Sequence, residues 1–494
     1  MQKKIVVIGS GFAGLSAATH LASQGHDVTI LEKNSQTGGR ARIWEKDGFT
    51  FDMGPSWYWM PEVFENYFKY FGKNIEDYYK LIRLDPAYRI YFKNNQVLDV
   101  PANLAALKLK FEEIEPGSGK ALDAFLKDAE YKYHTAMADY VSRLSDSVFE
   151  FVEPKLIIKS LQLNLFTSLR KVVRSKFKNP LLLSLLEFPV LFLGSTPSNT
   201  PALYSMMNYA DLVKGTWYPM GGMAMISKAF TDLAIEKGVK IILDAEVNKI
   251  EVKQDKVHSV HSKQGEFLAD IVVSGADYRH TEQVLLSPEN RVYSHQYWEN
   301  RTMSPSSLLF YIGVDKKIKN ILHHNLFFDE DFDQHAKEIY QNPQWPSKPL
   351  FYVCASSKTD PSCAPENSEN LFFLTPLAPG LKDDEEMREK YFNIMLKRLE
   401  EKSGESIREH IVVKRSYAMD DFISDYHSFK GNAYGLANTL KQTAFLKPKI
   451  KSKKVRNLFY TGQLTVPGPG VPPSIISGEI VSKEINRLIK LKKL

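Results

Sequence analysis

Apolar runs and helical spacings alternate at the start of the chain. Ile5–Ile8 is an uninterrupted run of branched apolar residues, as expected for a parallel strand that is buried on both faces. Apolar residues at helical spacing then predict a helix from about Ala13 to Ser23, which Gly25 ends. A second run, Val28–Leu31, predicts another strand. The chain therefore opens with a strand–helix–strand unit of an α/β fold.

The loop that joins the first strand to this helix carries a glycine motif. It fits the spacing G-x-G-x-x-G with Gly9, Ser10, Gly11, Phe12, Ala13 and Gly14. Such glycines allow a tight turn and a close approach of the backbone to a diphosphate, which the helix N-terminus also attracts. Glu32 and Lys33 follow the second strand, where an acidic side chain can accept hydrogen bonds from a ribose. The order of these signals predicts a dinucleotide site.

Further glycine-rich segments favour FAD over NAD in that site. Gly38, Gly39 and Arg40 supply a flexible turn and a cation for a second diphosphate contact. Gly54, Pro55 and Ser56 follow farther on, directly after Phe51, Asp52 and Met53. Near the C-terminus, a loop lies between a predicted strand over 457–462 and a predicted helix over about 475–489. Such a loop can bring backbone N–H groups to a flavin ring. Its candidate residues are Gly462, Gly470, Val471 and Pro472.

A third piece with strand patterns lies in the middle of the chain. A helix ending near Glu236 precedes four expected strands, over 240–243, 247–252, 257–260 and 270–273. The patterns predict a mixed α/β protein with a Rossmann-like FAD-binding domain built from 1–74, 216–289 and 446–494. The segments 75–215 and 290–445 are expected to form a discontinuous substrate domain of mixed sheet and helices, with strand or turn elements at 304–313 and 430–436.

Composition and charge exclude several classes of protein. The net charge of +6 is mild, and no basic patch is combined with a nucleic-acid motif, so no nucleic acid is expected as a partner. The two cysteines, Cys354 and Cys363, lack metal-ligand spacing. We predict no metal, and the adjacent His323 and His324 are interpreted as part of a surface loop. A reduced, cytoplasmic location is expected.

The segment 169–194 combines a basic run with an apolar run. Its apolar part is too short and too interrupted to span a bilayer, and no apolar run elsewhere reaches the roughly 18 residues required. The first residues do not resemble a signal peptide. The segment is typical of a peripheral membrane contact, while a core helix with a solvated basic end is an equal alternative.

Taken together, these motifs resemble those of bacterial phytoene desaturases, the FAD-dependent carotenoid desaturases of the amine-oxidase-like flavoprotein superfamily. The resemblance extends over nearly the whole chain and includes WYPMGG at 217–222, GAD at 275–277 and GPGVP at 468–472. In that superfamily a valine at the position of Val247 lies against the adenine. Pro469 between two glycines, and the sequence TGQL at 461–464, depart from the family pattern and leave the substrate and the number of steps open.

The resemblance implies an oxidoreductase of carotenoid biosynthesis. It would desaturate phytoene to a more conjugated carotene, with lycopene as the expected product, by hydride transfer to flavin and proton loss from the neighbouring carbon. The expected partners are a long apolar polyene, a membrane surface, and oxygen or a quinone as electron acceptor. The sequence contains no strong acid–base constellation, so the catalytic residue stays unknown.

Two alternatives remain open at this point. The first is a desaturase or saturase that acts on a hydroxylated or partly desaturated carotenoid, or on a retinoid. The second is a protein that binds prenyl lipids without catalysis, as the Rab GDP-dissociation inhibitors do on this fold. The intact glycines and Glu32 argue against the second alternative. An amine oxidase is disfavoured because no cysteine for a covalent flavin lies near the C-terminal loop.

Overall fold

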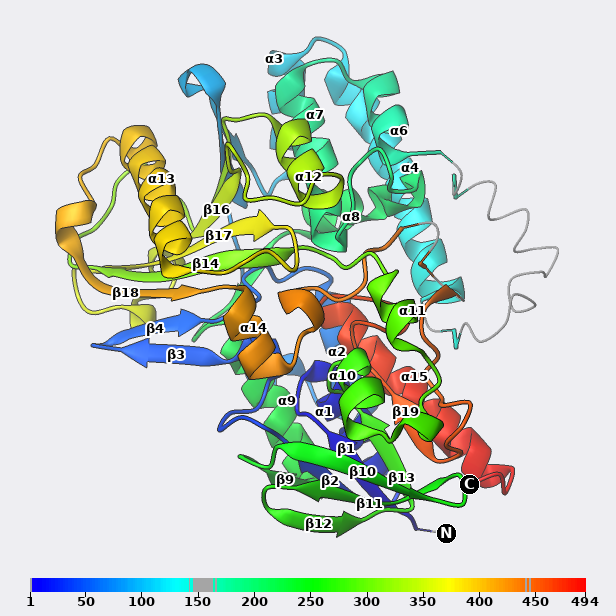
Figure 1. Cartoon of the computed structure of the whole chain (residues 1–494). Coiled ribbons are helices and arrows are strands. Elements are labelled where there is room, and N and C mark those ends of the chain that lie inside the picture. Colours follow the sequence, from blue (N-terminus) through cyan, green and yellow to red (C-terminus); the bar gives the residue numbers. More distant parts are fainter. Residues whose placement is uncertain (1, 142, 145–162, 165–166, 440–441, 444–445) are drawn as a thin grey trace.

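The computed structural model describes residues 2–141, 143–144, 163–164, 167–439, 442–443 and 446–494. Within these residues the predicted mixed α/β architecture is confirmed. Two large sheets, one of five and one of seven strands, dominate the described residues. Figure 1 shows the first near both chain termini and the second farther away, with helices beside each. Small two- and three-stranded sheets complete the strand structure of the described residues.

The five-stranded sheet is entirely parallel and combines three distant segments of the chain. Its order is β19 (Leu458–Tyr460), β13 (Ile271–Ser274), β1 (Lys4–Ile8), β2 (Asp27–Leu31) and β9 (Lys240–Ile242). β1 lies at the centre, which explains why its four apolar residues are all buried. The strand expected over 457–462 is shorter than predicted. The division of the chain into two domains stays a prediction.

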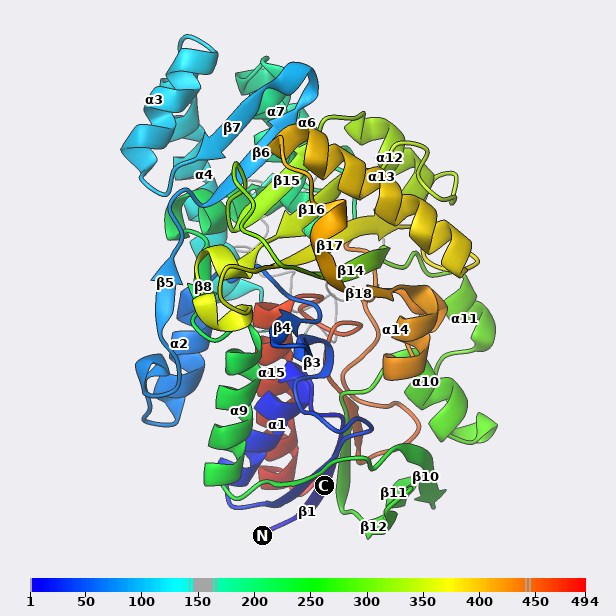
Figure 2. The ribbon, with the colours of Figure 1, turned by 90° about the vertical axis from the view of Figure 1, so that its left-hand side faces the viewer.

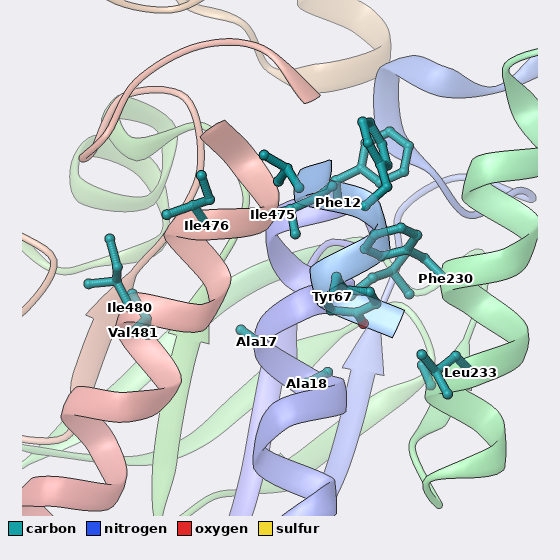
Figure 3. Packing of buried hydrophobic residues seen from close by; sticks show 14 of the residues in the cluster. Phe12, Ala17, Ala18, Tyr67, Phe230, Leu233, Ile475, Ile476, Ile480 and Val481 are labelled. Carbon is teal, nitrogen blue, oxygen red and sulfur yellow. The ribbon is translucent and has the colours of Figure 1, made fainter. Parts of the chain in front are cut away.

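Helix α1 (Phe12–Ser23) packs between α15 (Val471–Lys490) and α9 (Ala224–Glu236) on one side of this sheet. Figure 3 shows the contact: Ala17 and Ala18 of α1 face apolar side chains of both neighbours. Tyr67 of α2 (Pro61–Tyr70) stacks on Phe230 of α9, with ring centroids 4.1 Å apart. Because Ala17 and Ala18 are small, α15 and α9 can pack closely against α1.

The seven-stranded sheet forms the core of the other half of the molecule. Its order is β18 (Ile411–Tyr417), β14 (Ser306–Val314), β17 (Glu369–Leu377), β16 (Phe351–Cys354), β15 (His324–Phe328), β6 (Tyr88–Phe92) and β7 (Val97–Val100). All neighbours are antiparallel except β15 and β6. The strand expected at 304–313 is confirmed as β14, and 430–436 begins in a short helical turn at Phe429–Gly431.

The remaining strands form smaller sheets. β10 (Val247–Lys253) and β11 (Lys256–Ser262) were expected, but their antiparallel neighbour β12 (Gly265–Leu268) is too polar for its pattern to predict. The two-stranded sheets pair β3 (Ile43–Lys46) with β4 (Phe49–Asp52), and β5 (Leu81–Arg83) with β8 (Trp217–Pro219).

The other helices lie mostly around the seven-stranded sheet (Figures 1 and 2). They are α3 (Leu104–Ile114), α4 (Ser118–Asp139), α6 (Leu169–Lys176), α7 (Pro180–Glu187), α8 (Met206–Tyr209), α10 (Tyr278–His280), α11 (His295–Glu299), α12 (Phe332–Tyr340), α13 (Glu385–Ser403) and α14 (Met419–Tyr426). No helix among the described residues combines the length and the apolar character that crossing a membrane requires.

Candidate cofactor site and adjoining cavity

The predicted glycine turn lies at the carboxyl end of β1. Gly9 has a φ of +90°, which favours glycine, and Gly11 is the N-cap of α1. A Cβ on Gly11 would meet no atom within 4 Å, so this position borders open space. A Cβ on Gly14 would lie 2.0 Å from the carbonyl oxygen of Gly9. The first position therefore leaves room for a ligand, whereas the second packs the helix against the turn.

Glu32 lies at the end of β2, directly beside this turn. One carboxylate oxygen accepts hydrogen bonds of 2.7 Å from the backbone nitrogen and from the hydroxyl of Ser10. The other accepts from the backbone nitrogen of Asn34 at 2.9 Å and from its side-chain nitrogen at 3.1 Å. The carboxylate is buried and held in one orientation at the edge of the cavity.

Arg40 brings a half-buried positive charge to the same place. Its guanidinium lies 4.8 Å from the centre of the Tyr426 ring and donates to the hydroxyl of Ser428 at 3.3 Å. Its buried Nε has no hydrogen-bond partner among the described residues. Burial lowers the pKa of Arg40, against the opposing effects of Tyr426 and Asp277. A buried donor without a partner fits the diphosphate of a bound dinucleotide, and so does the open space beside Gly11.

These groups surround one end of a cavity of about 560 Å³. Its lining includes sixteen of the predicted site residues: Gly9, Gly11, Phe12, Ala13, Glu32, Lys33, Gly39, Arg40, Gly54, Pro55, Ser56, Val247, Gly462, Gly470, Val471 and Pro472. Ser10 and Gly14 do not line it, since Ser10 turns toward Glu32 and Gly14 lies beneath the turn. The individual contacts of these residues with FAD stay a prediction.

The C-terminal loop closes the cavity on the side of α15. The predicted start of its helix near residue 475 is wrong, because α15 already begins at Val471. Prolines 472 and 473 occupy its first turn, where a proline needs no backbone donor. The hydroxyl of Ser477 accepts from the backbone nitrogen of Gly462 at 3.0 Å. This bond ties the start of the loop after β19 to helix α15.

The other end of the cavity is apolar and could not be predicted from the sequence. Its walls come from α8, α12 and the seven-stranded sheet, and they include Met206, Met207, Phe328, Phe332, Ile339, Leu350 and Leu374. Tyr340 and Tyr434 add hydroxyls whose pKa burial raises, so both remain neutral. An elongated apolar molecule could lie here with one end at the cofactor.

Two histidines that the sequence analysis missed face the predicted nucleotide end. The rings of His280 and His427 stack with centroids 3.9 Å apart, and both line the cavity. Burial, assisted by the charge of His427, lowers the pKa of His280 to about 3. His427 Nε2 lies 3.0 Å from Glu246 and 3.2 Å from the ammonium of Lys33. Lys33 is therefore directed toward α14 and its neighbours.

The interpretation of His323 and His324 as a surface loop is wrong. Both are buried, and His324 begins β15, which has a strand on each side in the seven-stranded sheet. Within a strand, consecutive side chains point to opposite faces of the sheet. His323 lies just before β15, so this alternation does not separate its side chain from that of His324. Their ring centroids are 4.4 Å apart.

The segment 169–194 is packed against the protein by its apolar side. Leu182, Leu185 and Leu186 are fully buried, while Glu187 pairs with Arg174 at 2.9 Å. Lys171, Arg174, Lys176 and Lys178 are exposed. The arrangement agrees with a core helix that has a solvated basic end, and contact of this segment with a membrane stays a prediction.

The geometry of the site by itself indicates the class of the protein. The turn, the acid and the half-buried arginine line one end of the cavity at the edge of a parallel sheet, where they fit a dinucleotide, and the rest of the cavity leaves room for a second molecule. This is the arrangement of a dinucleotide-dependent oxidoreductase. Which redox group completes the dinucleotide follows from the proteins that the chain matches.

A family model described as flavin containing amine oxidoreductase matches residues 12–486. The chain is 42% identical over 478 residues to a carotenoid 3,4-desaturase of Haloarcula japonica, covering 96% of each chain. It is 32% identical to a zeta-carotene-forming phytoene desaturase of Myxococcus xanthus, covering 98% of this chain and 94% of the relative. An oxidoreductase from Methanosarcina mazei has the same fold, with a TM-score of 0.63, 16% identity and coverage of 97% and 100%.

The chain therefore belongs to the family of flavin containing amine oxidoreductases. A flavin combined with a dinucleotide site means that its cofactor is FAD, as the sequence predicted. The protein is an FAD-dependent oxidoreductase, and its resemblance to the amine-oxidase-like superfamily is confirmed.

Proposed function

We propose that this oxidoreductase is a carotenoid desaturase, which removes two hydrogens from adjacent carbons next to a polyene. The observation that carries the proposal is the apolar part of the cavity, which continues from the predicted FAD site to the seven-stranded sheet. The two curated relatives named above are both desaturases of carotenoids by name, and each matches nearly the whole chain. A long hydrocarbon fits walls of leucine, methionine and phenylalanine side chains.

When bound, FAD supplies the acceptor for a hydride. The described residues bind the substrate, orient it and exclude water. The apolar walls hold the polyene away from solvent, and the aromatic rings of Trp57 and Trp59 in the lining favour positive charge that develops near them. Tyr340 and Tyr434 stay protonated because burial raises the pKa of each, so the apolar end of the cavity carries no charge from these two hydroxyls.

Two substrates compete within this proposal. The motif resemblance favours phytoene, with lycopene as the product. The higher identity to the carotenoid 3,4-desaturase, 42% against 32% for the phytoene desaturase, favours a carotenoid other than phytoene, which we take to be hydroxylated or already partly desaturated. We take the second as the better supported substrate and keep phytoene as the alternative.

Pigment analysis in two hosts separates them. The chain is expressed in one host that accumulates phytoene and in another that accumulates a conjugated, hydroxylated carotenoid. A longer chromophore in the second host alone supports the preferred substrate, and lycopene in the first host supports phytoene. Unchanged pigments in both, with flavin-loaded protein present, would overturn carotenoid desaturation. A Gly11→Ala chain is the control for dependence on the flavin.

We also propose that the protein works at the cytoplasmic surface of a membrane, where its substrate resides, and passes electrons to oxygen or a quinone. The exposed lysines at 171, 176 and 178 support a contact with anionic lipid. Reversing these three charges should reduce co-sedimentation with anionic vesicles. Reversal of Lys382 and Lys397, which lie elsewhere and are also exposed, is the control. Equal binding by both variants would contradict this contact.

A further inference from the structure

Two histidines and a cysteine from neighbouring strands meet in the interior of the seven-stranded half. β15 and β16 pair in antiparallel fashion with His324 directly opposite Cys354, so their side chains share one face of the sheet. His323 directly precedes β15, and its ring centroid lies 4.4 Å from that of His324. One nitrogen of each imidazole and the sulfur of Cys354 all lie within 4.8 Å of one another. The exposed fractions of the three residues are 5%, 0% and 6%.

One ring nitrogen of each histidine is already engaged, and the other is free. Nδ1 of His323 lies 2.8 Å from the hydroxyl of Thr359, and Nδ1 of His324 lies 2.5 Å from that of Tyr352. The Nε2 atoms of both are buried without a hydrogen-bond partner among the described residues. When Nδ1 donates to a hydroxyl oxygen, Nε2 keeps its lone pair, which is the arrangement of histidines that bind a metal.

The surroundings provide space and suitable charge. A cavity of about 20 Å³ is lined by His323, Cys354, Asp52 and Ser56, among others, and a volume of this size holds one small ion or one water. Asp52 and Asp360 place carboxylates near the cluster, where they favour a cation.

We propose that His323, His324 and Cys354 bind one Zn²⁺ ion, with a fourth position open to the small cavity. Zinc prefers imidazole and thiolate ligands in this combination. On binding, the S–H bond of Cys354 breaks, a zinc–sulfur bond forms and the proton leaves to solvent. The ion would tie β15 to β16 and fix His324, whose ring stacks on Trp57 with centroids 4.2 Å apart. Trp57 lines the large cavity, so the zinc site would stiffen the wall of the substrate channel.

Metal analysis of the flavin-loaded protein tests the proposal without an activity assay. The chain is expressed in defined medium containing either Zn²⁺ or Co²⁺, so that the buried site is loaded during folding. We expect about one metal per protein. With cobalt, we expect a thiolate-to-metal charge-transfer band and the intense visible absorption of tetrahedral geometry. Cys354→Ser and His323→Gln should remove most of the metal and the charge-transfer band.

Cys363→Ser is the matched control, because Cys363 is the other buried cysteine and lies outside the three-ligand cluster. It should keep the metal and the band. The wild-type chain alone decides the matter if a variant fails to fold. Less than about a tenth of an equivalent of zinc or cobalt, copper in place of zinc, or a thiolate band that survives in Cys354→Ser would overturn the proposal.

Discussion

The carboxylate of Glu32 accepts two hydrogen bonds of 2.7 Å from Ser10, one from its backbone nitrogen and one from its hydroxyl. The contact joins the end of β2 to the glycine turn after β1. Because both partners are buried, the bond is shielded from water and holds the glycine turn against Glu32 without a ligand. It also connects Ser10 of the predicted glycine motif with Glu32, the predicted acid that follows the second strand.

Replacing Glu32 with Gln should weaken FAD binding by about tenfold or more, since a charged hydrogen-bond acceptor contributes roughly 1.5–3 kcal/mol. The amide also places a donor against the Ser10 nitrogen or the Asn34 nitrogen. Titration of the apoprotein with FAD, followed by flavin fluorescence, measures the change. Ser10→Ala, which removes one donor only, should have a smaller effect. Equal affinities of wild type and Glu32→Gln would refute the role assigned to this carboxylate.

Gly11→Ala and Gly14→Ala should separate ligand space from packing. A methyl group on Gly11 meets no protein atom, so the apoprotein should keep its thermal stability and lose FAD affinity. A methyl group on Gly14 collides with the Gly9 carbonyl at 2.0 Å, so this variant should lose stability by several kcal/mol or fail to fold. Thermal unfolding of both apoproteins provides the test. Full flavin loading of Gly11→Ala would show that the open space is not cofactor space.

The parts of this fold that follow from local sequence were predictable, and those that depend on strand register were not. The glycine motif, Glu32 and the strands around them lie within a few dozen residues and carry their own periodicity. The meeting of His324 with Cys354 depends on which strands pair, and no local pattern encodes that. The apolar cavity likewise combines Met206, Phe332 and Leu374 from separate elements. The start of α15 was misplaced because consecutive prolines suggested a loop, although a first helical turn accepts them.

Gly478 is a packing position that the motif analysis missed. A Cβ there would lie 2.5 Å from the carbonyl oxygen of Ala13 and 2.7 Å from the nitrogen of Ala17, both on α1. Gly478→Ala should therefore separate α15 from α1 and lower the free energy of unfolding by about 1–3 kcal/mol. Urea-induced unfolding measures the loss. Gly238→Ala gives a contrasting control, because a Cβ at Gly238 meets no neighbour and only its positive φ is strained. If Gly478→Ala unfolded at the same urea concentration as the wild type, the close contact would be disproved.

Asp211 should give the protein a stability component that falls as the pH rises. Burial raises its pKa to about 7, although the Tyr88 hydroxyl at 2.6 Å and the Thr216 hydroxyl at 3.2 Å lower it in part. The same carboxyl has a pKa near 3.9 in an unfolded chain. Between these two values the folded state keeps a proton that the unfolded state releases. The free energy of unfolding should therefore decrease with rising pH in this window, by up to about 1.4 kcal/mol per pH unit.

Asp211→Asn isolates this component, because an amide accepts from Tyr88 and cannot ionise. The urea midpoint of the variant should vary less steeply than that of the wild type between about pH 4 and pH 7, and the variant should be the more stable of the two at the upper end. Asp255→Asn removes an exposed carboxylate and should leave the wild-type slope unchanged. Parallel pH profiles for wild type and Asp211→Asn would show that Asp211 ionises in the folded protein as it does in the unfolded chain. The network from Tyr88 through Asp211 to Thr216 and on to Trp59 at the cavity wall would then hold a carboxylate at neutral pH.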